Sequence, residues 1–236
     1  PKMRFVIPLG GPSDDIEIIP LDGSTPDRLE GFSDNAVTEA ATVSPSGRLL
    51  VTAPSRNGPW TLRVWDLESG ELRLFDLPES TSSSTAGRAR GVWFMAFTDE
   101  STLYTSGDGG VRRWDLEAGT WESVLSTPAD HGTKMELAAD GRTAVVSDVQ
   151  LDDSILYGSG TLRLLDLVTG EDVRVDVGSA DDFGPNWSPD SSRIVFTSWA
   201  GATRPVLYDV ASGEVTPVDI VLDPMGWSPD GRSILG

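Results

Sequence analysis

Apolar residues along this chain come in short runs, and each run is separated from the next by polar or turn-forming residues. Runs such as Ile194–Phe196 and Val206–Tyr208 are rich in β-branched and aromatic residues, which favours strands over helices. Tight-turn residues such as Pro189 and Asp190 separate neighbouring runs. The pattern therefore predicts an all-β chain of short antiparallel strands.

The stretch 183–218 contains four such strands, here called A, B, C and D, which form two successive hairpins. Its two turns recur along the chain in one phase, which indicates a genuine repeat. The A-to-B turn recurs at Ser44–Arg48, Thr98–Thr102, Ala138–Arg142, Ser188–Ser192 and Ser228–Arg232, and the C-to-D turn at Trp65–Gly70, Trp114–Gly119, Leu165–Gly170 and Tyr208–Gly213. A period of roughly 40 to 50 residues with four strands per repeat is typical of β-propeller blades.

The Trp-Asp-Leu turns at 65–67 and 114–116 resemble those of WD-repeat propellers, and the Ser-Pro-Asp-Gly turn at 228–231 resembles those of bacterial TolB-like propellers. This resemblance covers nearly the whole chain. It implies a β-propeller of four-stranded antiparallel blades, with about five blades visible, and it implies almost nothing about function. One feature departs from the WD-repeat pattern: a Gly-His pair usually precedes strand A there, and this chain has a single histidine, His131.

We expect a single propeller domain, or a fragment of one, over residues 1–236. The predicted blades are 1–31, 35–78, 90–126, 133–178 and 183–220, with a partial blade at 223–236. The first blade lacks strand A, because Met3–Ile7, Ile16–Ile19 and Thr25–Leu29 fit strands B, C and D. The last segment supplies strands A and B. If it completed the first blade, that blade would have two B strands. Two interpretations stay open: a closed five-blade ring with a redundant tail, and a piece of a larger ring. The piece of a larger ring is favoured.

Composition narrows the classes of function. With 38% apolar residues and no apolar run near 18 residues, the sequence predicts a soluble protein without a membrane span. The chain has no cysteine, which excludes disulfides, thiol nucleophiles and zinc-thiolate sites. A net charge of −19 argues against nucleic acid as a partner. The chain starts at Pro1, so we expect it to be processed or excised from a longer chain. Its compartment, cytoplasmic or extracytoplasmic, stays open.

No catalytic residue and no metal site are predicted. A Ser-His-Asp triad would have to use His131, which we place in a D-to-A loop, and there is no Gly-x-Ser-x-Gly elbow. Residues 107–110 are glycine-rich but lack the lysine of a phosphate-binding loop. The repeated turn aspartates are predicted to cap their own turns, and the strand tryptophans to pack in the core. These residues are Asp66, Asp115, Asp166, Asp190, Asp209 and Asp230, and Trp65, Trp114, Trp187 and Trp227.

The candidate binding surface is the face formed by the B-to-C and D-to-A loops. These loops look long and irregular, whereas the A-to-B and C-to-D turns of the opposite face are short, and binding surfaces usually lie on irregular loops. The loop face gathers Asp14, Asp15, Asp34, Asp130, Asp148, Asp152, Asp153, Asp181, Asp182 and Asp223, against Arg56, Arg88, Arg90 and Arg204. Its candidate partner-binding residues are Trp60, Trp199, Arg56, Arg204, Asp152, Asp153, Asp181 and Asp182. A merely solvated acidic surface is the simpler alternative.

These observations favour a non-catalytic β-propeller scaffold that binds another protein or peptide, of basic character, through its loop-rich acidic face. Two alternatives stay open. The chain could be the gating or accessory module of a larger hydrolase resembling the prolyl oligopeptidase family. It could also be an extracytoplasmic TolB-like propeller that binds a small ligand or Ca²⁺. Apart from Ca²⁺ in this alternative, no cofactor is predicted.

Overall fold

The computed structural model describes residues 4–8, 16–20, 25, 27–29, 38–54, 61–78, 91–128, 131–150, 160–180, 185–198, 204–218 and 226–235. Every regular element within these ranges is a β-strand. Contacts group the chain into two compact units, residues 1–123 and 124–236, and each is described by itself. A helix able to cross a membrane does not occur in the described ranges.

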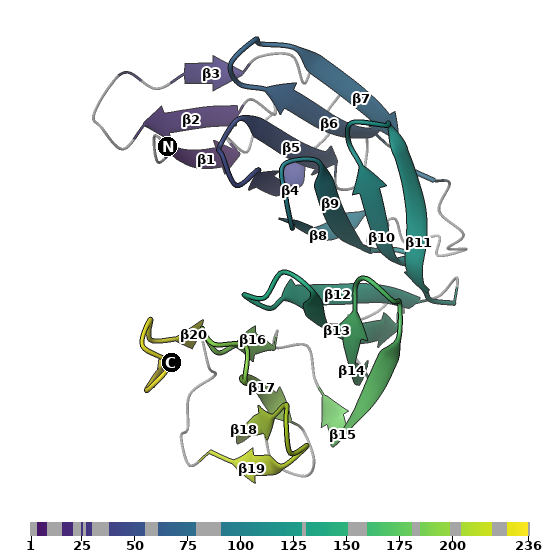
Figure 1. Ribbon diagram of the computed structural model, residues 1–236, viewed down its shortest axis with the longest axis vertical. Helices are drawn as coiled ribbons and strands as arrows, with labels where there is room; N and C mark the ends of the chain where they lie inside the picture. The colour runs from purple at the N-terminus through teal and green to yellow at the C-terminus, as the bar shows by residue number, and fades with distance from the viewer. Residues whose placement is uncertain are drawn as a thin grey trace. The chain divides into compact units, whose positions relative to one another are not determined.

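The first unit begins with three antiparallel strands in the order β1-β2-β3 (Figure 1). They are β1 (Arg4–Pro8), β2 (Ile16–Pro20) and β3 (Asp27–Leu29). Arg4 pairs with Pro20 and Ile16 with Leu29, so each strand runs antiparallel to the next. The three predicted strands of this sheet are confirmed among the described residues, and their assignment as strands B, C and D of a blade stays a prediction.

Two complete four-stranded sheets follow in the first unit, and each is a meander in sequence order. The first contains β4 (Thr38–Val43), β5 (Leu49–Pro54), β6 (Thr61–Asp66) and β7 (Leu72–Asp76). The second contains β8 (Val92–Phe97), β9 (Thr102–Gly107), β10 (Gly110–Asp115) and β11 (Thr120–Ser126), whose last residues cross into the second unit. A and B strands of each sheet are offset by a β-bulge, at Thr38/Ala40 and at Val92/Phe94.

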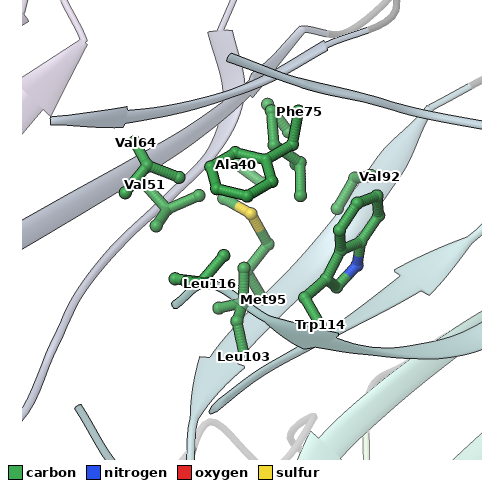
Figure 2. Packing of buried hydrophobic residues seen from close by; sticks show 11 residues of the cluster. Ala40, Val51, Val64, Phe75, Val92, Met95, Leu103, Trp114 and Leu116 are labelled. Carbon is green, nitrogen blue, oxygen red and sulfur yellow. The ribbon is translucent and has the colours of Figure 1, made fainter. Parts of the chain in front are cut away.

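A single apolar cluster joins these two sheets (Figure 2). Val51, Val64 and Phe75 come from β4–β7, and Met95 and Trp114 from β8–β11, with the Met95 sulfur directed toward Phe75. Trp114 is only 1% exposed. The alternation of strand residues therefore buries one face of each sheet against its neighbour, as stacked propeller blades require.

The second unit repeats this meander twice and then starts it again. Its strands are β12 (His131–Leu137), β13 (Thr143–Gln150), β14 (Gly160–Asp166), β15 (Asp172–Ala180), β16 (Asn186–Trp187), β17 (Arg193–Ser198), β18 (Arg204–Asp209), β19 (Val215–Pro217), β20 (Gly226–Trp227) and β21 (Ile234–Leu235). β12–β15 and β16–β19 form four-stranded groups that touch at the pair Ala180–Ser198, and β20–β21 form a separate pair. Trp187, Ile194 and Phe196 lie in the core of this unit.

The chain is thus an all-β β-propeller built from four-stranded antiparallel blades, as predicted. The core role predicted for the strand tryptophans is confirmed for Trp114 and Trp187, whereas Trp65 and Trp227 are half-buried. The blade boundaries and the single-domain organisation stay predictions.

Three sequence-based predictions about the loop face are wrong. His131 is the first residue of β12, paired with Gln150, and does not lie in a loop. Asp148 lies in β13, where its Oδ2 accepts a hydrogen bond from Arg163 at 2.8 Å. The connection from β9 to β10 is not long, because Gly107 and Gly110 are already paired across a tight hairpin. A side chain on Gly107 would overlap the carbonyl oxygen of Gly91, so this tight hairpin requires glycine.

Candidate functional site

The A-to-B and C-to-D turns of one blade are held together by an arginine and an aspartate. In β4–β7, Arg48 Nε and Nη2 both donate to Asp66 Oδ2, at 2.9 and 2.6 Å. In β12–β15, Arg142 makes the same two bonds to Asp166, at 2.8 and 2.6 Å. The hydrogen bond from Arg142 lowers the pKa of Asp166 to about 2. The sequence signal that could have identified this pair is the arginine that ends the A-to-B turn.

The turn aspartates also cap backbone N–H groups, which confirms the structural role predicted for them. Asp66 Oδ1 accepts from Glu68 N at 3.0 Å and from Ser69 N at 3.1 Å. The remaining five make the same type of bond within their own turns, namely Asp115, Asp166, Asp190, Asp209 and Asp230. These carboxylates are committed to the fold, and none of them is a candidate for catalysis.

The blade β8–β11 stabilises its A-to-B turn by different contacts. Ser101 occupies the position of the turn arginine, and Asp99 Oδ1 caps the turn by accepting from Ser101 N at 2.9 Å. The neighbouring Glu100 reaches the A-to-B turn of the adjacent blade, where it accepts from Ser46 N at 2.6 Å and from Ser46 Oγ at 2.8 Å. Partial burial opposes ionisation of Glu100, but the hydrogen bonds from the serines outweigh it and lower its pKa.

A cleft of about 750 Å³ opens between the turns of these two blades. Its lining residues come from the A-to-B and C-to-D turns of β4–β7 and β8–β11, and they are Ser46, Arg48, Leu49, Asp66, Glu68, Glu71, Arg73, Glu100, Ser101, Leu116 and Glu117. Arg73 ties the two walls together, because its Nη1 donates to the carbonyl oxygen of Leu116 at 2.7 Å. Its guanidinium carbon also lies 5.6 Å from the centroid of the Phe75 ring, a cation–π contact.

The cleft is acidic, with five carboxylates against two guanidinium groups. Asp66 and Glu100 are engaged within the fold, and the side chain of Glu68 is 78% exposed. Glu71 and Glu117 are exposed as well. The lining contains no histidine, and the pKa of Glu100 is lowered. Exposed carboxylates with no histidine among them suit recognition of a cation better than proton transfer.

A second polar group lies inside the blade β8–β11. Trp114 Nε1 donates to Thr105 Oγ1 at 3.0 Å, in the interior of the sheet. Arg112 Nη1 donates to the carbonyl oxygen of Asp108 at 2.9 Å and lies 5.8 Å from the Trp121 ring centroid. Burial lowers the pKa of Arg112. These contacts support the tight hairpin between β9 and β10, so we assign them a structural role.

The innermost strands of the second unit are linked by tryptophan. Trp187 Nε1 donates to the carbonyl oxygen of Glu136 at 3.1 Å, and Trp227 Nε1 donates to that of Asn186 at 3.0 Å. Each bond joins the A strand of one repeat to the A strand of the repeat before it. Burial raises the pKa of the Glu136 carboxyl to about 7, against an opposing hydrogen bond from the Trp187 main chain.

Most predicted partner-binding residues lie outside the described ranges, namely Trp60, Trp199, Arg56, Asp152, Asp153, Asp181 and Asp182. Arg204 is the first residue of β18 and pairs with Ser198, but its side chain is outside the description. Asp148 is not an exposed loop carboxylate, because its side chain is 12% exposed and bound to Arg163. In the described part of the chain, no group of three or more histidine, aspartate or glutamate residues is placed to hold a metal. The loop-face site therefore stays a prediction.

Comparison with known proteins supports the fold. No protein-family model matches the chain. A relative, the mitotic checkpoint protein BUB3.3 of Arabidopsis thaliana, is 34% identical over 99 residues, which are 42% of this chain. The chain spans 28% of the length of this relative.

Among solved structures, the C-terminal WD40 domain of Sif2 superposes with a TM-score of 0.60 at 18% identity, over 86% of this chain and 54% of that one. A GH74 enzyme of Niastella koreensis gives 0.64 at 16% identity, over 88% and 34%. TolB of Acinetobacter baumannii gives 0.51 at 16% identity, over 98% and 61%. The chain therefore has the WD-repeat and TolB-like propeller fold, and these distant similarities establish the fold alone.

Proposed function

We propose that this chain is a non-catalytic propeller scaffold that binds a protein or peptide carrying basic side chains. The observation that carries this proposal is the acidic cleft between β4–β7 and β8–β11. Its walls are fixed by the Glu100–Ser46 and Arg73–Leu116 bonds, so the exposed carboxylates are held on a preorganised surface. The similarity to BUB3.3, a protein named for the mitotic checkpoint, also supports a role in protein interaction.

The shape and charge of the cleft favour an extended basic segment over a small metabolite. A cleft of about 750 Å³ open to solvent can accept several side chains. Glu68, Glu71 and Glu117 offer acceptors for arginine or lysine, while Leu49 and Leu116 offer apolar surface for the methylene groups of those side chains.

Peptide binding tests this proposal directly. The full chain is applied to an array of arginine- and lysine-containing peptides, and the strongest peptide is then titrated by isothermal calorimetry. We expect the double variant Glu71→Gln/Glu117→Gln to bind that peptide about tenfold more weakly, since two acceptors are lost.

The chain contains a matched control. Glu171 and Glu214 occupy the position of Glu71 in other blades, directly after the turn glycine, and all three carbonyl oxygens accept the same backbone bond. The variant Glu171→Gln/Glu214→Gln changes the net charge equally and should keep the affinity. Equal weakening in both variants would show a response to net charge alone. Unchanged binding in both would place the peptide elsewhere. Either result would reject the cleft as the binding site.

The loop-rich acidic face is a second proposed surface for the same function. Trp60 and Trp199 are its aromatic candidates, and Asp152, Asp153, Asp181 and Asp182 its acidic ones. We expect Trp60→Ala and Trp199→Ala to keep cooperative unfolding and to weaken partner binding. Loss of cooperative unfolding in either variant would assign that residue to the core instead.

Binding of Ca²⁺ by the same loops is a separate proposal. Loop carboxylates are typical Ca²⁺ ligands, and a ligand that binds only the folded state raises its stability. Millimolar Ca²⁺ should then raise the melting temperature while Mg²⁺ does not. An unchanged melting temperature would reject this proposal and leave peptide binding untouched.

A further inference from the structure

Arg73 differs from the other arginine that lines the acidic cleft. Arg48 donates through Nε and Nη2 to the carboxylate of Asp66. The guanidinium of Arg73 instead contacts the carbonyl oxygen of Leu116, at 2.7 Å, and the ring of Phe75. In the described part of the chain, no carboxylate forms an ion pair with Arg73. The cleft therefore contains a cation without a counter-ion, although five carboxylates line it.

Two carboxylates of the same cleft are also available to a ligand. Glu71 and Glu117 are exposed, whereas Arg73 is half-buried. Within the described residues, both glutamates form hydrogen bonds through backbone atoms, as in the bond from Glu71 N to Ser69 Oγ and the bond from Glu117 N to Asp115 Oδ1. The cleft thus presents a recessed cation and exposed anions, which an occupant of one charge sign alone does not match.

Glu71 and Arg73 have the spacing of residues on one side of an extended chain. Glu71 directly precedes β7 and Arg73 is the second residue of that strand. Both line the cleft, as expected for residues i and i+2, which lie about 7 Å apart in an extended chain. A bound segment that lies extended along β7 has the same spacing. A basic side chain that binds Glu71 therefore places the side chain two residues away beside Arg73.

A carboxylate is the ligand group that best suits the Arg73 guanidinium. Arginine binds a carboxylate through two parallel N–H bonds, and its planar group is preorganised for them. The contacts with Leu116 and Phe75 hold Arg73 in place before a ligand arrives, which lowers the entropic cost of binding. An acidic segment alone would be repelled by the exposed glutamates and by the net charge of −19. The occupant therefore has to carry basic residues together with its carboxylate.

We propose that the cleft binds an extended segment of a partner protein in which an aspartate or glutamate lies two residues from a lysine or arginine. The basic side chain binds Glu71, and the acidic side chain binds the guanidinium of Arg73. This inference rests on the proposed function, because it names the sequence that the same cleft selects. It adds Arg73 as a residue that determines specificity.

The test uses the full chain and an array of short acetylated and amidated peptides, each rich in lysine or arginine, with one glutamate or glutamine placed at every position in turn. We expect the strongest binders to carry glutamate two residues from a basic residue. The strongest peptide is then titrated by isothermal calorimetry. Replacing its glutamate with glutamine should weaken binding about tenfold, although this change makes the peptide more positive.

A double-mutant cycle separates recognition by Arg73 from its contact with Leu116. Arg73→Gln should weaken binding of the glutamate peptide about tenfold and should not weaken binding of the glutamine peptide. Equal weakening of both peptides would mean that Arg73 only holds the walls of the cleft together, and would overturn the proposal. Arg113→Gln is the control, because it removes the same charge from an arginine outside the cleft that is bound to Glu122. It should keep both affinities.

The remaining outcomes distinguish this inference from the proposed function. Strongest binders without an acidic residue, or equal affinity of the glutamate and glutamine peptides, would overturn the inference and leave binding of a basic segment standing. Binding of no peptide in the array would reject both. A carboxylate effect that requires an unamidated C-terminus would also overturn the inference, because the anion would then be a chain end.

Discussion

In the blade β8–β11, Trp114 stands where the blade β12–β15 has Leu165, and Ser101 stands where it has Arg142. The blade β8–β11 is stabilised by an interior hydrogen bond from Trp114 to Thr105 and by the carboxylate of Glu100, which binds the neighbouring blade. In the blade β12–β15, an ion pair links the A-to-B turn to the C-to-D turn. The strand pattern and the turn caps are common to both, so these set the fold, whereas the polar links vary from blade to blade.

The largest effect is expected from the interior of β8–β11. Trp114→Ala removes a fully buried indole and should lower the free energy of unfolding by about 3 to 5 kcal/mol in chemical denaturation. Trp114→Phe and Thr105→Val should each cost about 1 to 3 kcal/mol, because each leaves a buried polar partner unsatisfied. The double variant places apolar side chains at both positions, where β12–β15 has Leu165 and Val146. Its loss of unfolding free energy should be smaller than the sum of the two single losses. Strict additivity would mean that the hydrogen bond contributes nothing.

The second effect is a pH dependence that only β12–β15 should show. Burial raises the pKa of Glu136 from 4.5 to about 7, so the folded state holds its proton more tightly than the unfolded chain. Its contribution to stability is present below pH 4.5 and is lost as the pH rises through 7, by about 3 kcal/mol at most. Glu136→Gln should flatten this part of the stability curve measured by urea denaturation. An unchanged slope in the variant would show that another group titrates.

A smaller effect should follow from the link between blades. Glu100→Ala removes two hydrogen bonds to Ser46 and should cost about 1 kcal/mol in urea denaturation. Ser46→Ala removes the hydroxyl contact to Glu100 and also the bond that Ser46 Oγ accepts from Arg48 N. The second loss is common to both backgrounds, so the cycle of single and double variants isolates the Ser46 Oγ–Glu100 bond. A coupling energy near zero would mean that this bond does not connect the two blades.

The smallest effect concerns the exposed ion pair. Arg142→Gln should lower the melting temperature slightly at neutral pH and low salt, and high salt should reduce the difference. Because the pKa of Asp166 is lowered to about 2, this contribution is present above pH 3.8 and is lost as the pH falls through 2. The reverse transplant, Ser101→Arg, places an arginine beside Asp115 and should raise the melting temperature slightly. A fall instead would show that the shorter turn of β8–β11 cannot hold the pair.

The sequence predicted the features that depend on local pattern. The alternation in Ile16–Ile19 and the turn at Asp66 each specify a strand or a cap within a few residues, and both are confirmed. Contacts between blades could not be predicted from the sequence, because Ser46 and Glu100 are 54 residues apart and meet only after two sheets have packed. The tight β9–β10 hairpin also escaped prediction, since it depends on the close approach of Gly107 to Gly91.

The candidate site shows the same limit. Reasoning from loop length favoured the B-to-C and D-to-A loops, whereas the described cleft lies among the short turns of the opposite face. The aspartates of the short turns are predicted to be structural, and their capping bonds confirm that role. The exposed glutamates beside those caps, such as Glu68 and Glu117, gather in one cleft only because adjacent blades align equivalent turns. Trp60 and Trp199, the aromatic residues predicted on the loop face, lie outside the described ranges.

The tryptophan bonds between successive A strands have a consequence for synthesis on the ribosome. In both cases the donor belongs to the later strand and the acceptor carbonyl to the earlier one, Trp187 to Glu136 and Trp227 to Asn186. A newly emerged repeat therefore finds its docking position already in place on the repeat translated before it. We therefore expect the second unit to acquire its register in the direction of translation, with each blade serving as the template for the next.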